Sequence, residues 1–360
     1  MSSSIIIGKL ISALAQFSGF SATALPGLIV LKLKPNFISD LINQTKLKSI
    51  IITGTNGKTT TARLVGDILK KEKIEFIHNR FGSNLIRGIA STLINQISWL
   101  GKFKSNWAVW EVDEAALSEA CRQLKPIIVL FNNLSRDQLD RYGETDAILK
   151  SWQKAINHLP PNSKVLINQT QPNLLQLQHP NRVLFGQPFG FDYQQANFQA
   201  AAAIAKNLGL KPTSINQAIK EFRPVFGRGE IVNYQGRRIL IILVKNPAGF
   251  NAVLNLLTAQ NKLAKKLLII LNDKVADGTD VSWIWDIHFN NLSSRLKPII
   301  VSGSRTLDMA LRLKYAGLNP NLIIIEPNIY KALKFKPSII LPTYTAMLKL
   351  RQIISNQKFN

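Results

Sequence analysis

A short glycine turn between an apolar run and a helical pattern constrains the fold of this chain more than any other feature. The run from Leu47 to Thr53 is apolar and rich in β-branched residues, as in a buried strand. From Thr59 to Lys71 the apolar residues Ala62, Val65 and Leu69 recur at helical spacing. A strand, a glycine turn and a helix in succession are the setting of a phosphate-binding loop.

The turn supplies the groups that a nucleotide phosphate requires. It consists of Gly54, Thr55, Asn56, Gly57, Lys58, Thr59 and Thr60. Backbone N–H groups and the helix N-terminus attract phosphate oxygens, the Lys58 ammonium reaches the outer phosphates, and the Thr59 hydroxyl is a ligand for Mg²⁺. Ile52 stands where the usual motif has its first glycine, and the alternative is a chance glycine turn with a surface lysine.

Further apolar runs alternate with helical patterns in the first part of the chain. Strands are expected at 107–112, 127–131 and 164–167, and helices at 114–123, 146–158 and 194–208. This alternation predicts an α/β fold with a parallel, doubly wound sheet. The small side chains of Ala200–Ala203 predict close packing of the last of these helices on the sheet.

The same pattern restarts after Pro224 and predicts a second, smaller α/β domain. Its strands are expected at 238–244, 266–271, 298–302 and 321–325, with helices between them. We therefore expect an N-terminal helical or extended segment at 1–40, a central nucleotide-binding domain at 41–225 and a C-terminal α/β domain at 226–360.

Carboxylates follow the strand expected at 107–112. Open α/β sheets place their ligands at the carboxyl ends of the strands, so Glu111 is a candidate ligand for Mg²⁺. Alternatively, these acids cap the helix that follows, an interpretation that fits Asp113 and Glu114 better than Glu111.

A second acidic cluster lies in the C-terminal part of the chain, where Asp277, Asp280 and Asp286 stand beside Trp283 and Trp285. Acids next to indoles suit a partner surface or an active site. The alternative is an aromatic core strand flanked by acids in turns.

Composition leaves the choice of partner open. Lys and Arg total 45 against 21 acidic residues, and this excess attracts polyanions such as nucleic acid, an anionic membrane or a phosphorylated substrate. A bias of the whole organism toward lysine is the alternative.

The single cysteine, Cys121, excludes an internal disulfide and a multi-cysteine zinc site. The four histidines lack metal-ligand spacing and are interpreted as structural or exposed: His78, His158, His179 and His288.

The uncharged stretch from Leu10 to Leu31 superficially resembles a secretory signal. Polar residues dilute it and Pro26-Gly27 breaks it, so it is too discontinuous to span a bilayer. We expect a short amphipathic helix ending near Gly19 and a soluble, cytoplasmic protein that touches the inner face of the membrane at most.

The segment Thr53–Thr61 resembles the ATP loop of the Mur ligase family. Within that family, four further segments resemble the synthetase subunits of lipid II isoglutaminyl synthase: 25–35, Arg136–Glu144, Lys245–Asn251 and Asp277–Asp286. Gln138 stands where other Mur ligases carry a histidine, and the glutamine is typical of the isoglutaminyl branch.

This resemblance implies an ATP- and Mg²⁺-dependent amide synthase of peptidoglycan biosynthesis. Such an enzyme phosphorylates the α-carboxylate of D-glutamate in the lipid II stem peptide, and ammonia then displaces the phosphate to give D-isoglutamine. The resemblance implies that Lys58, Thr59 and Glu111 carry the chemistry, and that Asn197 and Arg228 contact the nucleotide.

The resemblance also implies a heterodimer with a class-I glutaminase subunit that supplies the ammonia, and no nucleic-acid partner. An aspartate of the C-terminal domain completes the glutaminase site in trans, with Asp280 as the first candidate and Asp277 as the second. Many relatives carry a four-cysteine zinc ribbon, whereas this chain has no cysteine after Cys121 and is expected to bind no zinc. The carbamylated lysine of Mur ligases has no counterpart in register, although Lys150 and Lys154 lie near its place.

Two alternatives to this function remain. One is a different Mur-type ligase that adds an amino acid or acts on a folate, and the other is a non-catalytic scaffold for the glutaminase.

Overall fold

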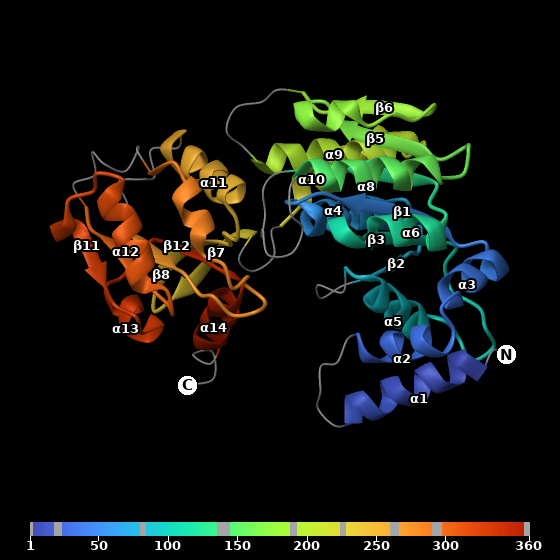
Figure 1. The fold of residues 1–360 in the computed structure, drawn as a ribbon, viewed down its shortest axis with the longest axis horizontal. Helices are drawn as coiled ribbons and strands as arrows, with labels where there is room; N and C mark the ends of the chain where they lie inside the picture. The colour runs from blue at the N-terminus through green and yellow to red at the C-terminus, as the bar shows by residue number, and fades with distance from the viewer. Residues whose placement is uncertain are drawn as a thin grey trace. The chain divides into compact units, whose positions relative to one another are not determined.

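The computed structural model describes residues 3–17, 24–79, 84–134, 145–187, 193–223, 228–259, 266–289 and 297–355. The chain forms two compact units: most of the chain up to Phe222 belongs to the first, and the chain from Arg223 belongs to the second (Figure 1). Each unit is built around its own six-stranded sheet. The α/β fold class predicted from the sequence is confirmed.

The sheet of the first unit is parallel throughout its described strands and has the order β2-β3-β1-β4-β5-β6. Its strands are β1 (Lys48–Thr53), β2 (Ile77–His78), β3 (Trp107–Glu111), β4 (Ile128–Phe131), β5 (Lys164–Asn168) and β6 (Arg182–Phe185). Ile50, Ile51 and Ile52 of β1 are fully buried, as expected for a strand covered on both faces. The predicted doubly wound sheet is therefore present, and its edge strands β2 and β6 were not predicted.

Helices cover both faces of this sheet. On one face lie α4 (Lys58–Lys71), α9 (Tyr193–Asn207) and α10 (Pro212–Glu221). Ala200 and Ala201 of α9 are fully buried against this face, which confirms the close packing predicted from the alanine run. On the other face lie α3 (Phe37–Thr45), α5 (Ile86–Gln96), α6 (Leu117–Leu124) and α8 (Thr145–Asn157).

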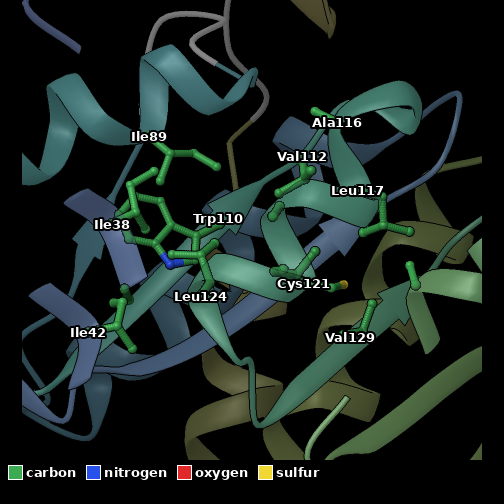
Figure 2. Close-up of a cluster of buried hydrophobic side chains, with 14 of the residues drawn as sticks. Ile38, Ile42, Ile89, Trp110, Val112, Ala116, Leu117, Cys121, Leu124 and Val129 are labelled. Carbon is green, nitrogen blue, oxygen red and sulfur yellow. The ribbon is translucent and has the colours of Figure 1, made fainter. Parts of the chain in front are cut away.

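The core of the second face is organised around Trp110 of β3 (Figure 2). Its indole is fully buried among Ile38, Ile89 and Leu124, and the indole N–H donates to Ser49 Oγ at 3.1 Å. A buried tryptophan is stabilised when its one polar atom has an acceptor, as here. This core fixes β3 beside β1, which matters for the site below.

Two further helices, α1 (Ser3–Phe17) and α2 (Leu25–Leu33), pack on α5. The helix α1 corresponds to the amphipathic helix predicted before Gly19. Among the described residues, no helix combines the length and the apolar character needed to cross a bilayer.

The second unit has the strand order β11-β10-β9-β12-β8-β7, and among its described strands only β7 is antiparallel to its neighbour. Its strands are β7 (Arg228–Tyr234), β8 (Arg237–Ile242), β9 (Leu267–Ile270), β10 (Ile299–Ser302), β11 (Ile323–Ile325) and β12 (Ile339–Pro342). The helices are α11 (Pro247–Ala259), α12 (Thr306–Tyr315), α13 (Ile329–Lys334) and α14 (Tyr344–Ser355), with short 3₁₀ turns η3 (Ser282–Asp286) and η5 (Pro320–Leu322).

Candidate active site

The glycine turn joins β1 to α4 in a conformation that only glycine adopts without strain. Gly54 and Gly57 have φ angles of +135° and +85°. A Cβ atom on Gly57 would stand 2.1 Å from Asn197 Oδ1, and one on Gly54 would stand 2.7 Å from the carbonyl oxygen of Asn133. The positive φ angles and the lack of space therefore both require glycine at positions 54 and 57. The turn is a specific, packed loop and not a chance surface turn.

Asparagines from two other elements hold the turn in shape. Asn133, which follows β4, accepts a hydrogen bond from Asn56 N at 2.8 Å and donates one to Asn56 O at 2.9 Å. Asn132 Nδ2 also donates to Asn56 O, at 3.1 Å, and lies 3.3 Å from Asn197 Oδ1 of α9. The structure thus brings Asn197, which the resemblance assigned to nucleotide contact, to the turn itself. Within the described part of the chain, the buried Asn132 Oδ1 accepts no hydrogen bond.

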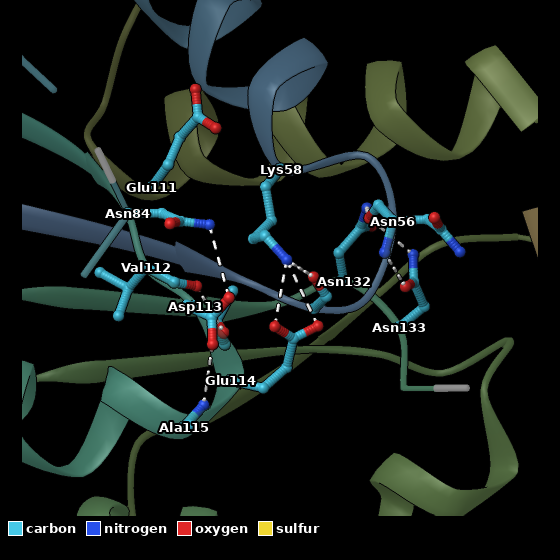
Figure 3. A network of polar contacts seen from close by, with 12 residues as sticks. Asn56, Lys58, Asn84, Glu111, Val112, Asp113, Glu114, Ala115, Asn132 and Asn133 are labelled. Atoms are coloured by element: carbon cyan, nitrogen blue, oxygen red, sulfur yellow. Dashed lines mark hydrogen bonds and ion pairs between the residues drawn. The ribbon is translucent and has the colours of Figure 1, made fainter. Parts of the chain in front are cut away.

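Lys58, the first residue of α4, extends back over the turn (Figure 3). Its Nζ donates to Gly54 O at 2.5 Å and lies 3.2 and 3.3 Å from the two carboxylate oxygens of Glu114. The Glu114 side chain is 3% exposed and that of Lys58 is 11% exposed, so water screens this ion pair little. The ammonium is therefore held at the mouth of the turn, where a phosphate chain would meet it.

The capping interpretation of the acids after β3 is correct for Asp113 and wrong for Glu114. Asp113 Oδ1 accepts a hydrogen bond from Ala115 N at the start of the 3₁₀ turn η1 (Glu114–Ala116). The Glu114 side chain instead points to Lys58, while the Trp152 indole N–H donates to its carbonyl oxygen at 3.2 Å. Glu114 belongs to the site because β1 and β3 are neighbours, so the residues after them meet at one edge of the sheet.

Glu111 and Thr59, the two residues proposed to hold Mg²⁺, are in direct contact. Thr59 Oγ1 donates to Glu111 Oε2 at 2.7 Å, and the Glu111 side chain is largely buried. Asn79 fixes the Glu111 backbone by two hydrogen bonds, at 2.9 Å to its N and 2.8 Å to its O. His78 Nε2 lies 3.3 Å from Glu111 Oε1, a contact that the sequence did not reveal.

These oxygen groups fit Mg²⁺, which prefers one or two carboxylates together with water and phosphate oxygens. Among the described residues, no three His, Cys, Asp or Glu side chains gather as a metal cage. A site of one carboxylate and one hydroxyl beside a phosphate loop has the composition expected for a metal bound jointly by protein and nucleotide.

Comparison with known protein families agrees with this geometry. The Mur ligase middle domain matches residues 52–236, and the MurT ligase C-terminal domain matches residues 243–347. The chain belongs to the Mur ligase family. The middle-domain match begins one residue before Thr53 and includes every residue of the site described above.

Named relatives match this Mur ligase along most of their length. The lipid II isoglutaminyl synthase (glutamine-hydrolyzing) subunit MurT of Staphylococcus aureus strain COL is 28% identical over 95% of this chain and 94% of its own. The subunit of the same name from Streptococcus pneumoniae is 29% identical over 93% of each chain.

Solved structures of Mur ligases share the fold. MurF from Acinetobacter baumannii superposes with a TM-score of 0.70 at 17% identity, covering 91% of this chain and 80% of that one. MurF from Thermotoga maritima in complex with ADP gives a TM-score of 0.68 at 14% identity, covering 91% and 84%.

Two predicted groups of residues belong to the second unit of this Mur ligase. Arg228 begins β7, where its backbone is in register with Ile242 of β8. Asp277 is buried, with Oδ1 accepting from Thr345 N at 2.7 Å and Oδ2 accepting from Thr345 Oγ1 at 2.5 Å. Asp277 thus ties the loop after β9 to the start of α14.

Asp280 has a different environment. Its carboxylate accepts from Ser282 N at 2.7 Å and from Ser282 Oγ at 2.9 Å, and it is only partly buried. The two neighbouring indoles differ as well, since Trp283 is buried in the core and Trp285 is half-exposed against Tyr315. Trp283 therefore belongs to the core, although it lies in the 3₁₀ turn η3 and not in the strand that the alternative interpretation expected.

Proposed function

We propose that this chain is the ATP-dependent synthetase subunit of a lipid II isoglutaminyl synthase. It would amidate the α-carboxylate of D-glutamate in the lipid II stem peptide to D-isoglutamine. The observation that carries the proposal is the contact of Thr59 with Glu111 beside the Lys58 turn, which unites the groups for the metal and the phosphates. Near-full-length similarity to subunits bearing that name supports the choice of substrate.

The reaction makes a poor electrophile reactive. Mg²⁺·ATP supplies the γ-phosphoryl group: a carboxylate oxygen of the substrate bonds to γ-phosphorus, the bond to ADP breaks, and an acyl phosphate forms. Ammonia then bonds to the acyl carbon, phosphate leaves, and the nitrogen loses a proton. Positioning and electrostatics provide most of the catalysis in such a transfer.

Each residue has a role in this scheme. Lys58 would exchange Glu114 for phosphate oxygens and neutralise charge on the outer phosphates, and Thr59 and Glu111 would be the protein ligands of the metal. The amides of Lys58, Thr59 and Thr60 belong to the first turn of α4, where backbone N–H groups lack an acceptor within the helix. Asn197 and Asn132 hold the turn in shape, and we assign Arg228 to nucleotide phosphate as a further proposal.

The ammonia would come from a separate glutaminase subunit, since the related proteins are named subunits of glutamine-hydrolysing synthases. We assign Asp280 rather than Asp277 to the glutaminase site because Thr345 occupies both oxygens of Asp277.

An exposed apolar strip on α12, formed by Leu307, Leu311 and Tyr315, continues through Trp285 toward this loop and suits a partner subunit. ATP places the reaction on the cytoplasmic side of the membrane.

ATP turnover tests the proposal. The purified complex with its glutaminase partner is supplied with lipid II and glutamine, and wild type is compared with Lys58→Ala. We expect a loss of about 10²- to 10³-fold in turnover. Lys70→Ala, an exposed lysine on the same helix, is the matched control and should be fully active.

Equal activity in Lys58→Ala and wild type would remove the catalytic role and leave a scaffold. Product analysis separates the other alternative, because a ligase that adds an amino acid would consume that amino acid and ignore ammonia.

A further inference from the structure

The helix α1 packs through one side only. Ile5 and Ser12 are buried, and Ser12 Oγ donates to Asn95 Oδ1 of α5 at 2.6 Å. Between them, a Cβ atom on Gly8 would stand 3.0 Å from the side chains of Ile94 and Val30. Small residues on this side therefore let α1 lie close against α2 and α5.

The opposite side of α1 carries large aliphatic side chains where a surface helix normally carries polar ones. Ile6 and Ile7 are each 38% exposed, and Leu10 is 54% exposed. At about 100° per residue these three positions form one continuous strip. Lys9 is the only charged residue in the whole helix. A contiguous group of exposed aliphatic side chains on the outward side of a helix marks an interaction surface.

The strip continues onto the loop after α5. Trp99 is 56% exposed and Leu100 is 85% exposed, and Lys9 Nζ lies 5.2 Å from the centre of the Trp99 ring, which joins the loop to α1. We call Ile6, Ile7, Leu10, Trp99 and Leu100 the N-terminal apolar surface. Figure 1 shows α1 as the outermost helix of the first unit, beside α2.

Lysines follow this surface along the chain. Lys102 and Lys104 are exposed directly after the loop. Before Ser49 the sequence has five lysines and a single acid, Asp40, and Lys34 neutralises that acid at 2.6 Å. Two copies meeting through this face would oppose their lysines, which is unfavourable. Aliphatic side chains with a tryptophan and neighbouring lysines match the chemistry of an anionic lipid interface.

We propose that the N-terminal apolar surface docks on an anionic membrane. Its aliphatic side chains and Leu100 enter the boundary between headgroups and acyl chains, Trp99 lies at headgroup level, and the lysines meet lipid phosphates. This is peripheral binding along the plane of the membrane. Docking through this surface does not depend on the nucleotide site.

Vesicle sedimentation of the purified full chain tests the docking, without nucleotide or lipid II. Wild type should sediment with vesicles of equal parts phosphatidylglycerol and phosphatidylcholine, and much less with phosphatidylcholine alone or in high salt. The double variant Ile6→Ser/Leu10→Ser should lower the partition coefficient by about tenfold or more. Lys102→Gln/Lys104→Gln should weaken binding to the anionic vesicles only.

Matched controls come from the second unit. Leu307→Ser/Leu311→Ser removes exposed aliphatic side chains of α12, and Lys314→Gln/Lys331→Gln removes exposed lysines. Both controls should sediment like wild type. Ile6→Leu/Leu10→Ile preserves apolar character and should also bind. Lys58→Ala should bind vesicles normally, so failure of the proposed catalytic function would not affect this assay.

A second measurement tests the docking without the serine variant, in case that variant does not fold. Brominated acyl chains should quench Trp99 fluorescence, seen as the difference between wild type and Trp99→Phe. Absence of vesicle binding by wild type, unchanged binding of the serine variant, or absence of Trp99-dependent quenching would each overturn the proposal. A dimer in light scattering that the serine substitutions dissociate would also overturn it, since a second copy would then cover the surface.

Discussion

The Nζ of Lys58 lies 3.2 Å from a carboxylate oxygen of Glu114, although 56 residues separate them in the chain. Both side chains are largely buried, so the pair is more than a surface contact. In the proposed reaction, a phosphate chain would compete with Glu114 for the lysine ammonium. The ion pair keeps the cation beside the turn.

Glu114→Gln should lower stability and favour nucleotide binding. Removal of the carboxylate leaves the Lys58 charge poorly compensated, and we expect a loss of roughly 1–3 kcal/mol in the free energy of unfolding without nucleotide. A non-hydrolysable ATP analogue should bind several-fold more tightly, because its phosphates no longer compete with a carboxylate. Denaturant unfolding and calorimetric titration measure the two effects.

Glu119→Gln is the control for this variant, since Glu119 pairs with Arg122 on the exposed side of α6. This substitution should lower the free energy of unfolding by less than about 1 kcal/mol and leave nucleotide affinity unchanged. Weaker analogue binding by Glu114→Gln would show that Glu114 assists the nucleotide rather than competing with it.

Gly57→Ala should disrupt the turn. The added methyl group would lie 2.1 Å from Asn197 Oδ1 at a positive φ, and both strain and collision oppose it. We expect a loss of more than about 2 kcal/mol in stability together with loss of ATP binding. Gly209→Ala shares the positive φ but has nothing within 4 Å, and should cost only about 1 kcal/mol. Equal effects of the two substitutions would contradict the role of the collision.

Local pattern was sufficient to predict the turn and its surroundings. A β-branched run before Gly54 and helical spacing after Lys58 depend only on nearby residues, and β1 and α4 formed as expected. The Thr59–Glu111 contact followed from a general rule, because ligands gather at the carboxyl ends of parallel strands.

Predicting the Lys58–Glu114 ion pair and the edge strands would have required information that a single sequence does not contain. Glu114 meets Lys58 only because β3 pairs with β1, and the order of strands in a sheet is a long-range property. His78 reaches Glu111 from β2, which has two residues and gives no periodic signal. The central strand β12 ends at Pro342, a residue type that argues against a strand, so it too escaped prediction.

Glu111→Gln should remove the metal dependence of nucleotide binding. The amide retains the size of the side chain and its contact with Thr59 but loses the charge that Mg²⁺ requires. We expect turnover to fall by about 10²- to 10³-fold. ATP affinity without Mg²⁺ should stay near the wild-type value. Binding titrations at several Mg²⁺ concentrations measure this, and an unchanged Mg²⁺ response would remove Glu111 from the metal site.

Cys121 should be chemically silent in the folded protein. Burial raises the pKa of its thiol to about 12, so almost no thiolate exists at neutral pH. Alkylation by iodoacetamide should be at least about 10²-fold slower in the native protein than in the unfolded chain. Mass spectrometry of timed samples measures both rates, and rapid labelling without denaturant would show that the core around α6 opens readily.

Substitutions of the two candidate aspartates of the second unit should have different effects on stability and on glutamine hydrolysis. Asp277→Asn weakens the bonds to Thr345 and should cost roughly 1–3 kcal/mol in stability, with glutamine hydrolysis retained wherever the protein is folded. Asp280→Asn should leave stability within about 1 kcal/mol and lower glutamine hydrolysis in the complex by about 10²-fold or more, because an amide cannot stabilise a charged imidazole. Glutamate release and thermal unfolding, measured on the same complexes, separate the two roles. If Asp280→Asn hydrolyses glutamine at the wild-type rate while still bound to its partner, another residue completes the glutaminase site.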